Sequence, residues 1–476
     1  MVFTMKKTIQ AVVSFFVVAA LIAVGLFSLS DLTERKESIH KFGDFYKQEA
    51  NFDVLFVGQS HVLNGIFPME LWNDYGIVSY NLAGHGNRPA TSYWVMKNAL
   101  LHTNPKLVVF DCGMIGMDEK IGPVEQLHIS TDSIPYSRLK VEMIQDLVED
   151  EKQRNELLWN FSTYHNRWNE IEKNDFEPQY SVEKGAESRI DVAVPDEMVY
   201  FYESLDVEEE TLGMEYTRRI IEECQEAGIE VLLTYLPFPD KTGWQLEANS
   251  VDDIAEEYGV DYLDFYTLLE QVNLNTDYYD SNSHLNPSGA RKITNYIGKY
   301  IMENYSIEDQ RENEVYSSWH DDYEIYTAFK KENIKKEEEL KNYLMLLNDK
   351  NLSFGIYIKP WNSIGNYPVL IELLGNIGID YSQIPNEDYF LLVDRVGNER
   401  KEMRLFESLE SRFAEFTMFY NDDGQLELLN SESDSMVITR ADIAVVVFDN
   451  SDLSFIDQAN FVLKDMPMEF GENTQD

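Results

Sequence analysis

Residues 53–65, DVLFVGQSHVLNG, decide the fold of the long N-terminal part of the chain. The run from Val54 to Val57 is apolar without alternation, which is typical of a strand buried on both faces of a parallel sheet. Gly58 permits a sharp turn where the strand ends. Ser60 therefore follows the carboxyl end of this strand, where open α/β sheets bind their ligands. We interpret Ser60 as a candidate nucleophile.

Four further apolar runs are expected to be strands, and helical patterns separate them. This alternation predicts right-handed crossovers and a mainly parallel sheet. The irregular stretch 118–206 interrupts it, and we interpret that stretch as an insertion that caps the strand ends. A structural excursion away from the site is the alternative. The expected strands are 77–82, 106–111, 229–236 and 260–265, and the expected helices are 91–102, 212–227, 245–258 and 287–303.

The composition excludes some classes of function. The 476 residues include 39 Lys and Arg against 85 Asp and Glu, so the formal net charge is -46. No nucleic-acid partner is expected, because phosphate backbones attract Lys and Arg, and broad adhesion to anionic membranes is disfavoured too. A well-solvated surface explains the same acidity. Cys112 and Cys224 lack zinc-site spacing, so no metal or cofactor is expected; a disulfide and two reduced, buried thiols both stay open.

An apolar run from Ala11 to Leu29 follows Lys6 and Lys7 near the N-terminus. Its length matches a bilayer hydrocarbon core of about 30 Å. The preceding lysines predict a cytoplasmic N-terminus and an extracytoplasmic bulk. A cleaved signal peptide is the alternative, but the run is long and no Ala-x-Ala site follows it. We expect a single-pass protein of the cell membrane, held by an uncleaved signal anchor.

A second polar loop, residues 277–289, precedes the last expected helix and contains Asp280 and His284. A serine nucleophile needs a base such as histidine, and that histidine needs an acceptor that fixes its tautomer. Convergence of the two strand-end loops would let Ser60 attack, His284 accept the proton and Asp280 orient the imidazole. The plainer interpretations are a turn serine and a histidine that makes a local cap bond. We interpret His61 and His85 as structural or supporting residues.

These motifs resemble those of the SGNH/GDSL hydrolase superfamily over about residues 53–303. Gly58-Gln59-Ser60-His61 resembles the Gly-x-Ser-His variant of bacterial cell-envelope members, such as proteins of alginate acetylation and teichoic-acid D-alanylation. Residues 80–86, YNLAGHG, resemble the second block of the family, and residues 284–289, HLNPSG, resemble the final block. The resemblance implies a flavodoxin-like, three-layer α/β/α fold. It also implies an oxyanion hole from the backbone amides of Ser60 and of Gly84 or Gly86.

The chain departs from the family pattern at two positions. Asp280 and His284 are one residue further apart than in Asp-x-x-His, and Cys112-Gly113-Met114 stand where a Gly-x-Asn-Asp block is usual. We expect Asn87 to supply the missing oxyanion-hole amide.

The resemblance implies a serine O-acyltransferase or esterase acting on acyl groups of cell-envelope polysaccharide or polymer, with water exclusion deciding between the two. A multi-spanning membrane acyltransferase is the implied acyl donor and partner. The alternative is a catalytically silent surface-binding or assembly protein that keeps the fold. An unreactive Ser60 would favour that alternative.

The C-terminal part is expected to be a small α+β or β-sandwich domain with hairpins at 416–429 and 443–463. Its Ala444–Asp449 stretch resembles interleukin-like EMT-inducer domains, and we expect either carbohydrate or partner binding or a purely structural role. The predicted parts of the chain are 1–30 as cytoplasmic tip and anchor, 31–52 as stalk, 53–305 as SGNH-like domain, 306–348 as linker and charged helix, 349–470 as the small domain and 471–476 as a disordered tail.

Overall fold

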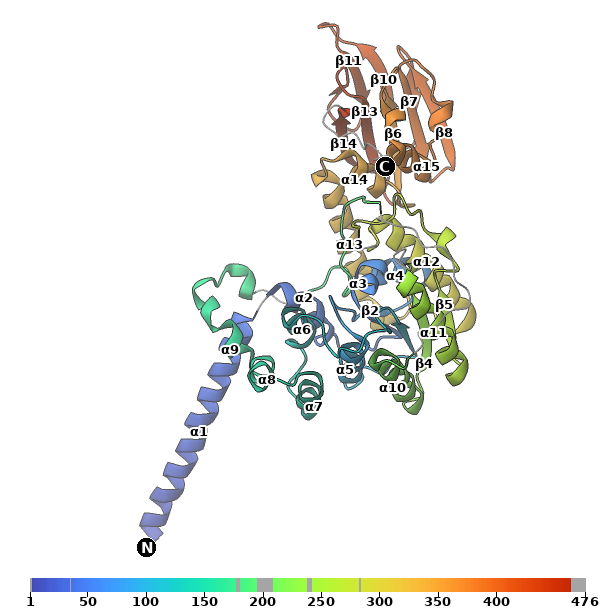
Figure 1. The fold of residues 1–476 in the computed structure, drawn as a ribbon. Helices are drawn as coiled ribbons and strands as arrows, with labels where there is room; N and C mark the ends of the chain where they lie inside the picture. Colours follow the sequence, from blue (N-terminus) through green and yellow to red (C-terminus); the bar gives the residue numbers. More distant parts are fainter. Residues whose placement is uncertain are drawn as a thin grey trace, which may run out of the picture. The chain divides into compact units, whose positions relative to one another are not determined.

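The structure, a computed structural model, describes residues 2–34, 36–176, 180–194, 209–237, 242–281 and 284–463. The tail 471–476, for which we expect disorder, lies outside these described residues. The chain forms two compact units, coloured along the sequence in Figure 1. The first unit comprises Met1–Glu187, Val199–Leu268 and Thr294–Trp319, and the second comprises Ser188–Met198, Leu269–Ile293 and His320–Asp476.

The first unit is built on a parallel five-stranded sheet in the order β2-β1-β3-β4-β5. This is the doubly wound order of flavodoxin-like folds, and it confirms the predicted fold class. All four residues of β1 are buried, as expected for a strand with neighbours on both sides and helices on both faces. The strands are β1 (Val54–Val57), β2 (Ser79–Asn81), β3 (Leu107–Asp111), β4 (Glu230–Tyr235) and β5 (Asp261–Asp264).

Right-handed crossovers determine which face of the sheet each helix covers. The connection from β1 to β2 runs one way along the sheet and the later connections run the other way, so α4 (Pro68–Tyr75) and α5 (Pro89–Ala99) cover opposite faces. α10 (Leu212–Glu226) lies beside α5 (Figure 1). α12 (Pro287–Asn304) approaches α4 closely at Gly298, where a Cβ would lie 2.6 Å from leucine and tyrosine side chains of α4. The sheet therefore has helices on both faces, as the three-layer fold requires.

The expected insertion between β3 and α10 consists of short helices and irregular segments. Residues 181–187 lie against β2, because the Asn81 amide donates to the Lys184 carbonyl at 3.0 Å. Residues 177–179 and 195–208 lie outside the described part, so the capping of the strand ends stays a prediction. The helices are α6 (Val124–Thr131), α7 (Arg138–Leu147), α8 (Glu151–Leu158) and α9 (Asn160–Tyr164), followed by 3₁₀ turns at His165–Asn169 and Lys173–Phe176.

The N-terminal helix α1 (Val2–Thr33) contains the expected apolar segment. The segment from Ile9 to Ser30 has a mean hydropathy of 2.7, and its most apolar stretch is not buried inside the fold. By length and composition this helix can cross a membrane, and a signal sequence near the N-terminus would have the same properties. The short helix α2 (Lys36–Phe45) follows it and leads toward β1.

Residues 306–319, expected to begin a linker, pack against the first unit instead. Gln310 Nε2 donates to Asp53 Oδ2 at 3.0 Å, and the Tyr316 hydroxyl donates to the Asn51 carbonyl at 2.9 Å. The ring of Trp319 lies 5.4 Å from that of Trp72. A polar composition concealed this packing, because only a few aromatic and amide side chains make the contacts.

The second unit is mainly antiparallel, as expected, with one sheet in the order β14-β13-β6-β7-β8 and another in the order β12-β11-β10-β9. Alternate residues of β13 face two cores: Val445 and Val447 pack with helices, whereas Val446 and Phe448 pack with the four-stranded sheet. The hairpins expected at 416–429 and 443–463 are confirmed as β10–β11 and β13–β14. The strands are β6 (Leu352–Ile358), β7 (Tyr389–Asp394), β8 (Glu399–Arg404), β9 (Ser408–Glu410), β10 (Glu415–Tyr420), β11 (Leu426–Asn430), β12 (Met436–Val437), β13 (Ile443–Asp449) and β14 (Phe455–Phe461).

The charged helix expected within 306–348 is two helices. α13 (Ser318–Lys336) ends before three successive glutamates, and α14 (Leu340–Leu346) begins after them. Glu339 has the extended backbone of an N-cap, with φ −91° and ψ 125°, so the helical hydrogen bonds cannot continue through it. The unit also contains α15 (Pro368–Asn376) and the short 3₁₀ turns Leu269–Gln271, Ile364–Asn366 and Tyr381–Gln383.

Candidate active site

The turn after β1 places Ser60 at the carboxyl edge of the sheet. A Cβ at Gly58 would lie 2.8 Å from Val62 Cγ2 and 3.2 Å from Asp111 Cβ, so a side chain at this position would clash. Glycine therefore lets the strand pass directly into the one-turn helix α3 (Ser60–Gly65). Ser60 is half-buried at the start of this helix, while the residues after it are buried. The motif predicted this location from the sequence.

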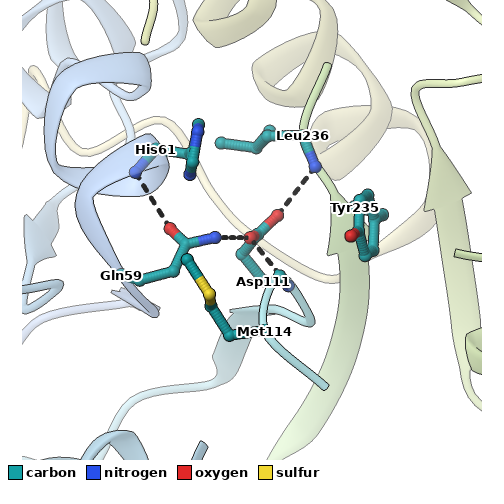
Figure 2. Close-up of a pocket in the computed structure, with 7 residues that line it drawn as sticks. Gln59, His61, Asp111, Met114, Tyr235 and Leu236 are labelled. Carbon is teal, nitrogen blue, oxygen red and sulfur yellow. Dashed lines mark hydrogen bonds between the residues drawn. The ribbon is translucent and has the colours of Figure 1, made fainter. Parts of the chain in front are cut away.

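Gln59 holds the turn that carries Ser60. Its Oε1 accepts a hydrogen bond from the His61 amide at 2.9 Å, and its Nε2 donates to Asp111 Oδ1 at 2.7 Å (Figure 2). The first bond joins the two residues that flank Ser60, and the second joins Gln59 to Asp111. The backbone of the candidate nucleophile is thus tied to the end of β3.

The carboxylate of Asp111 is the centre of this network. Besides Gln59 Nε2, it accepts bonds from the amides of Gly113 at 3.1 Å and Leu236 at 2.8 Å, and from Thr234 Oγ1 at 3.1 Å. Burial raises the pKa of Asp111 to about 6, and the hydrogen bonds act in the opposite direction. At neutral pH the group is mostly ionised, so its bonds are charge-assisted. The Asp111 carboxylate, at the end of β3, thus bonds to Gln59 after β1 and to Thr234 of β4, at the edge of the sheet where Ser60 lies.

Sequence reasoning did not identify Gln59 and Asp111 as part of the site. The signal was present, since Asp111 ends a buried strand at the position where the family's third block would begin. A small pocket lies next to the pair, and Figure 2 shows His61 and Leu236 above Gln59 and Asp111. The residues that line it are Gln59, His61, Asp111, Gly113, Met114, Tyr235 and Leu236.

The loop after β2 also reaches the turn of β1. The Gly84 amide donates to the Gly58 carbonyl at 3.2 Å, and Asn87 Nδ2 lies 3.4 Å from the same oxygen. Asn87 Oδ1 in turn accepts a bond from Ser130 Oγ at 2.8 Å. Two of the predicted oxyanion donors, Gly84 and Asn87, are therefore used here to hold the two loops together.

Gly86 occupies a position that favours glycine. Its φ is +62°, and Gln126 Oε1 would lie 1.8 Å from a Cβ built there. Gly84 and Asn87 donate to the Gly58 carbonyl. Among the described bonds, the amides of Ser60 and Gly86 are the two predicted oxyanion donors that do not donate to that oxygen.

Three ionisable side chains, those of Lys41, His85 and Glu187, lie at this loop. His85 Nε2 lies 2.9 Å from Glu187 Oε2, and Lys41 Nζ donates to the Ala83 carbonyl. Burial lowers the pKa of Lys41 to about 7, and the nearby carboxylate of Glu187 opposes that shift. Backbone bonds also join Glu187 to α3, where its amide donates to the Leu63 carbonyl at 3.0 Å. His85 thus connects the glycine loop to the last segment of the insertion.

In the second unit, Asp280 and His284 form the pair that the sequence predicts. Asp280 Oδ2 lies 2.8 Å from His284 Nδ1, and Asp280 Oδ1 accepts a bond from the His284 amide at 3.1 Å. The ring of Tyr279 stacks on the imidazole with centroids 5.5 Å apart. The additional residue between Asp280 and His284 therefore does not prevent the carboxylate from reaching the ring.

The loop that carries His284 is anchored on both sides of the histidine. Tyr278 and Leu285 form an isolated antiparallel bridge, and the Tyr279 amide donates to the His284 carbonyl at 2.9 Å. Asn286 is fully buried, and its Oδ1 accepts from the amides of Ser288 and Gly289 at the start of α12. The final motif thus has a structural function, because its asparagine caps the helix that follows the histidine.

The predicted site residues come from both units: Ser60, Gly84, Gly86 and Asn87 from the first, and Asp280 and His284 from the second. The transfer of a proton from Ser60 to His284 stays a prediction. The two cysteines, Cys112 and Cys224, are buried free thiols, which answers the question that the sequence left open.

No protein-family model matches the chain. No curated protein matches it either.

Solved structures do show similarity to the chain. One is described as a lipolytic protein of the G-D-S-L family from Desulfitobacterium hafniense DCB-2, at 13% identity and a TM-score of 0.28, covering 52% of this chain and 99% of that one. Another is described as an acylhydrolase from Bacteroides fragilis NCTC 9343, at 12% identity and a TM-score of 0.28, covering 54% and 92%. A third is an acetyl xylan esterase, Est2A, from Butyrivibrio proteoclasticus, at 7% identity and a TM-score of 0.24, covering 52% and 63%. The chain is thus similar to GDSL-type lipolytic proteins and esterases, on a sheet with the flavodoxin-like strand order.

Proposed function

We propose that this chain is a membrane-anchored serine esterase or O-acyltransferase that acts on acyl groups of an extracytoplasmic cell-envelope polysaccharide or polymer. The observation that carries the proposal is the 2.8 Å contact between Asp280 Oδ2 and His284 Nδ1. A carboxylate at Nδ1 fixes the tautomer in which Nε2 is the basic nitrogen. A histidine held in this way is suited to accept the proton of a serine hydroxyl.

In the proposed reaction, Ser60 Oγ attacks the acyl carbonyl while His284 Nε2 takes the hydroxyl proton. The carbonyl oxygen becomes an oxyanion, which the amides of Ser60 and Gly86 stabilise. Collapse of the tetrahedral intermediate breaks the bond to the leaving alcohol, which receives the proton from His284. The acyl-enzyme then reacts with a sugar hydroxyl in transfer or with water in hydrolysis, and the same histidine takes the proton of that acceptor.

The membrane part of the proposal rests on α1, whose apolar segment would place the remaining chain outside the cytoplasm. An anchored enzyme meets envelope polymer at the membrane surface. A multi-spanning membrane acyltransferase that delivers the acyl group from inside the cell is the partner that such a transfer reaction requires.

A fluorophosphonate probe tests the acyl chemistry directly. The probe forms a covalent bond with an activated serine, so the full chain should be labelled, and Ser60→Ala and His284→Ala should abolish the labelling. His165→Ala is the matched control, because His165 is exposed and its ring contacts only nearby residues of its own segment, the Ser162 carbonyl and the Phe161 ring, among the described residues. Labelling that persists in Ser60→Ala contradicts the assignment.

Cells that express Ser60→Ala in place of the natural chain supply the second test. The acyl content of the envelope polymer should change in them, downward for a transferase and upward for an esterase. An unchanged acyl content contradicts the proposed substrate class, even where the probe labels Ser60.

One observation favours a second candidate, a catalytically silent binding or assembly protein. Gly84 and Asn87 use their N–H groups on the Gly58 carbonyl, which leaves fewer donors for an oxyanion. Each missing donor weakens transition-state stabilisation by about 3 kcal/mol. Absence of probe labelling, together with envelope binding by the intact chain, would select this candidate.

A further inference from the structure

The membrane-facing part of the chain contains a cavity that the acyl chemistry does not use. It lies in the first unit, between the C-terminal end of α1 and the helices of the insertion. Ala23, Leu26 and Phe27 of α1 form one wall, and Ile134 and Leu158 of the insertion lie on another. The cavity is thus walled largely by apolar side chains, some of them on the helix that would lie in the bilayer.

Specific hydrogen bonds hold the insertion against the end of α1. Arg167 Nη1 donates to the Thr33 carbonyl at 3.0 Å, and Asn160 Nδ2 donates to Glu34 Oε1 at 2.5 Å. Asn160 Nδ2 also lies 3.3 Å from the Asp132 carbonyl. These bonds place α9 and the following 3₁₀ turn at the level where α1 leaves its apolar segment. For an anchored chain this level is the membrane–water interface.

The end of the cavity near this level is polar. Lys140 is buried, and its Nζ donates to the carbonyls of Asp132 at 3.1 Å and Ile134 at 2.9 Å. Ser30, Glu34 and Asn160 line the same region. Polarity therefore increases along the cavity in the direction in which it increases from a bilayer core to its headgroups.

Large aromatic side chains around the cavity are exposed to an unusual degree. Tyr136 is 67% exposed and Trp159 is 54% exposed, and both line the cavity. Trp168 and Phe176, in the 3₁₀ turns that follow α9, are 68% and 71% exposed. Tyr and Trp gather at membrane interfaces, where an apolar ring and a polar edge are both accommodated. The net charge of -46 leaves apolar contact, rather than electrostatic attraction, as the means by which this surface would hold lipid.

We propose that this cavity binds a bilayer lipid, with an acyl chain along Ala23, Leu26 and Phe27 of α1 and its headgroup near Tyr136 and Trp159. The occupant follows from the position of the wall: the α1 side chains that form it are surrounded by lipid once the helix is in a membrane. The insertion then rests on the membrane surface and keeps the enzyme unit close to it. The inference depends on the anchor in the proposed function and is independent of the chemistry at Ser60.

The test uses the full chain in nanodiscs of phosphatidylcholine and phosphatidylglycerol, with a small share of phosphatidylcholine that carries a photoreactive diazirine in one acyl chain. After irradiation and proteolysis, lipid adducts are mapped by mass spectrometry. We expect adducts on residues 134–162 of the insertion as well as on α1. Adducts confined to α1 would overturn the proposal. A second copy of the chain or another protein in the cavity would exclude lipid from it and give this result.

Two tryptophan variants of α1 distinguish a bound lipid from lipid that only touches the surface. Ala23→Trp fills the cavity from the lipid-exposed helix and should remove most adducts from residues 134–162. Leu21→Trp places the same side chain on α1 at a residue that does not line the cavity, and it should leave the adducts unchanged. Equal adduct yields in both variants would overturn the proposal.

Alkaline carbonate extraction of membranes separates the failure of this inference from failure of the anchor. A chain that stays in the membrane but lacks insertion adducts overturns the lipid site alone. A chain released by carbonate overturns the anchor and the lipid site together. Probe labelling of Ser60 is unaffected by either result, because it reports the acyl chemistry separately.

Discussion

Gln59 Nε2 lies 2.7 Å from Oδ1 of Asp111, so the residue before the candidate nucleophile is bonded to a buried carboxylate at the end of another strand. Gln59 is a neutral amide, and the negative charge beside the nucleophile turn comes from Asp111 at the end of β3. The arrangement explains why Asp111 is buried with four donors around it, and it makes the position of Ser60 depend on β3 and β4.

Gln59→Leu should reduce both stability and reactivity. The substitution leaves the Asp111 carboxylate with one donor fewer and leaves the His61 amide without its cap, which costs about 1–3 kcal/mol of unfolding free energy. Probe labelling of Ser60 should slow, because the turn is no longer tied to β3. Urea unfolding and labelling rates measure the two effects. Gln225→Leu, at an exposed glutamine, is the control, and equal losses in both variants would argue against a specific role for the Gln59 bond.

Asp280→Asn should abolish most of the reactivity of Ser60 while the chain stays folded. The amide can donate to His284 Nδ1, which favours the tautomer with its proton on Nε2, and serine proteases lose about 10⁴-fold in kcat from this change. Asp280 has a side-chain exposure of 27%, so the loss of stability should be small. Labelling rates across a range of pH check the prediction, with Asp422→Asn as an exposed control. A labelling rate like that of the unmodified chain would exclude Asp280 from the mechanism.

Glu247→Gln should change how stability depends on pH. Burial raises the pKa of Glu247 from 4.5 to about 7, so the folded chain holds this proton more tightly than the unfolded chain. The free energy of unfolding therefore falls as pH rises from about 4.5 through 7, by up to about 3 kcal/mol from this group. The glutamine variant lacks that loss and can still accept the bond from the Tyr235 hydroxyl.

Chemical unfolding of both forms at several pH values between about 4.5 and 8 gives the comparison. The variant should gain stability relative to the unmodified chain as pH rises, and contributions from Asp111 and Asp264 cancel because both forms contain them. A stability difference that does not vary with pH would contradict the raised pKa of Glu247.

Gly58→Ala should destabilise the first unit by about 1–3 kcal/mol, because the new methyl group overlaps with Val62. Combining it with Val62→Ala should recover part of that loss, since the smaller side chain leaves room for the methyl group. Gly375→Ala is the control: a Cβ there meets nothing within 4 Å, and alanine favours its helix. Thermal unfolding monitors Gly58→Ala, Val62→Ala, the double variant and the control, and strictly additive losses in the double variant would argue against the steric cause.

Several features of this chain follow from local sequence. The apolar runs predict five strands, since a parallel strand is covered on both faces, and the structure confirms each of them as a strand. The edge strand β5 differs from the others because only Leu263 in it is buried. The hairpin at 416–429 follows from alternation on both sides of a turn-forming Asn-Asp-Asp-Gly. The polar contact between Asp280 and His284 spans only four residues, so their spacing already brings it within reach.

Other features depend on how distant segments pack. Gln59 meets Asp111 over a separation of 52 residues, and Leu236 meets the same carboxylate over 125 residues. Gly84 and Asn87 bond to the Gly58 carbonyl because the loops after β1 and β2 meet at one edge of the sheet. Periodicity and propensity act over a few residues and determine the elements, whereas strand order decides which of their ends become neighbours. The sequence by itself therefore determined the strands of the parallel sheet, most of the helices between them and the candidate chemistry, and only the tertiary structure decided which polar groups hold the nucleophile turn in place.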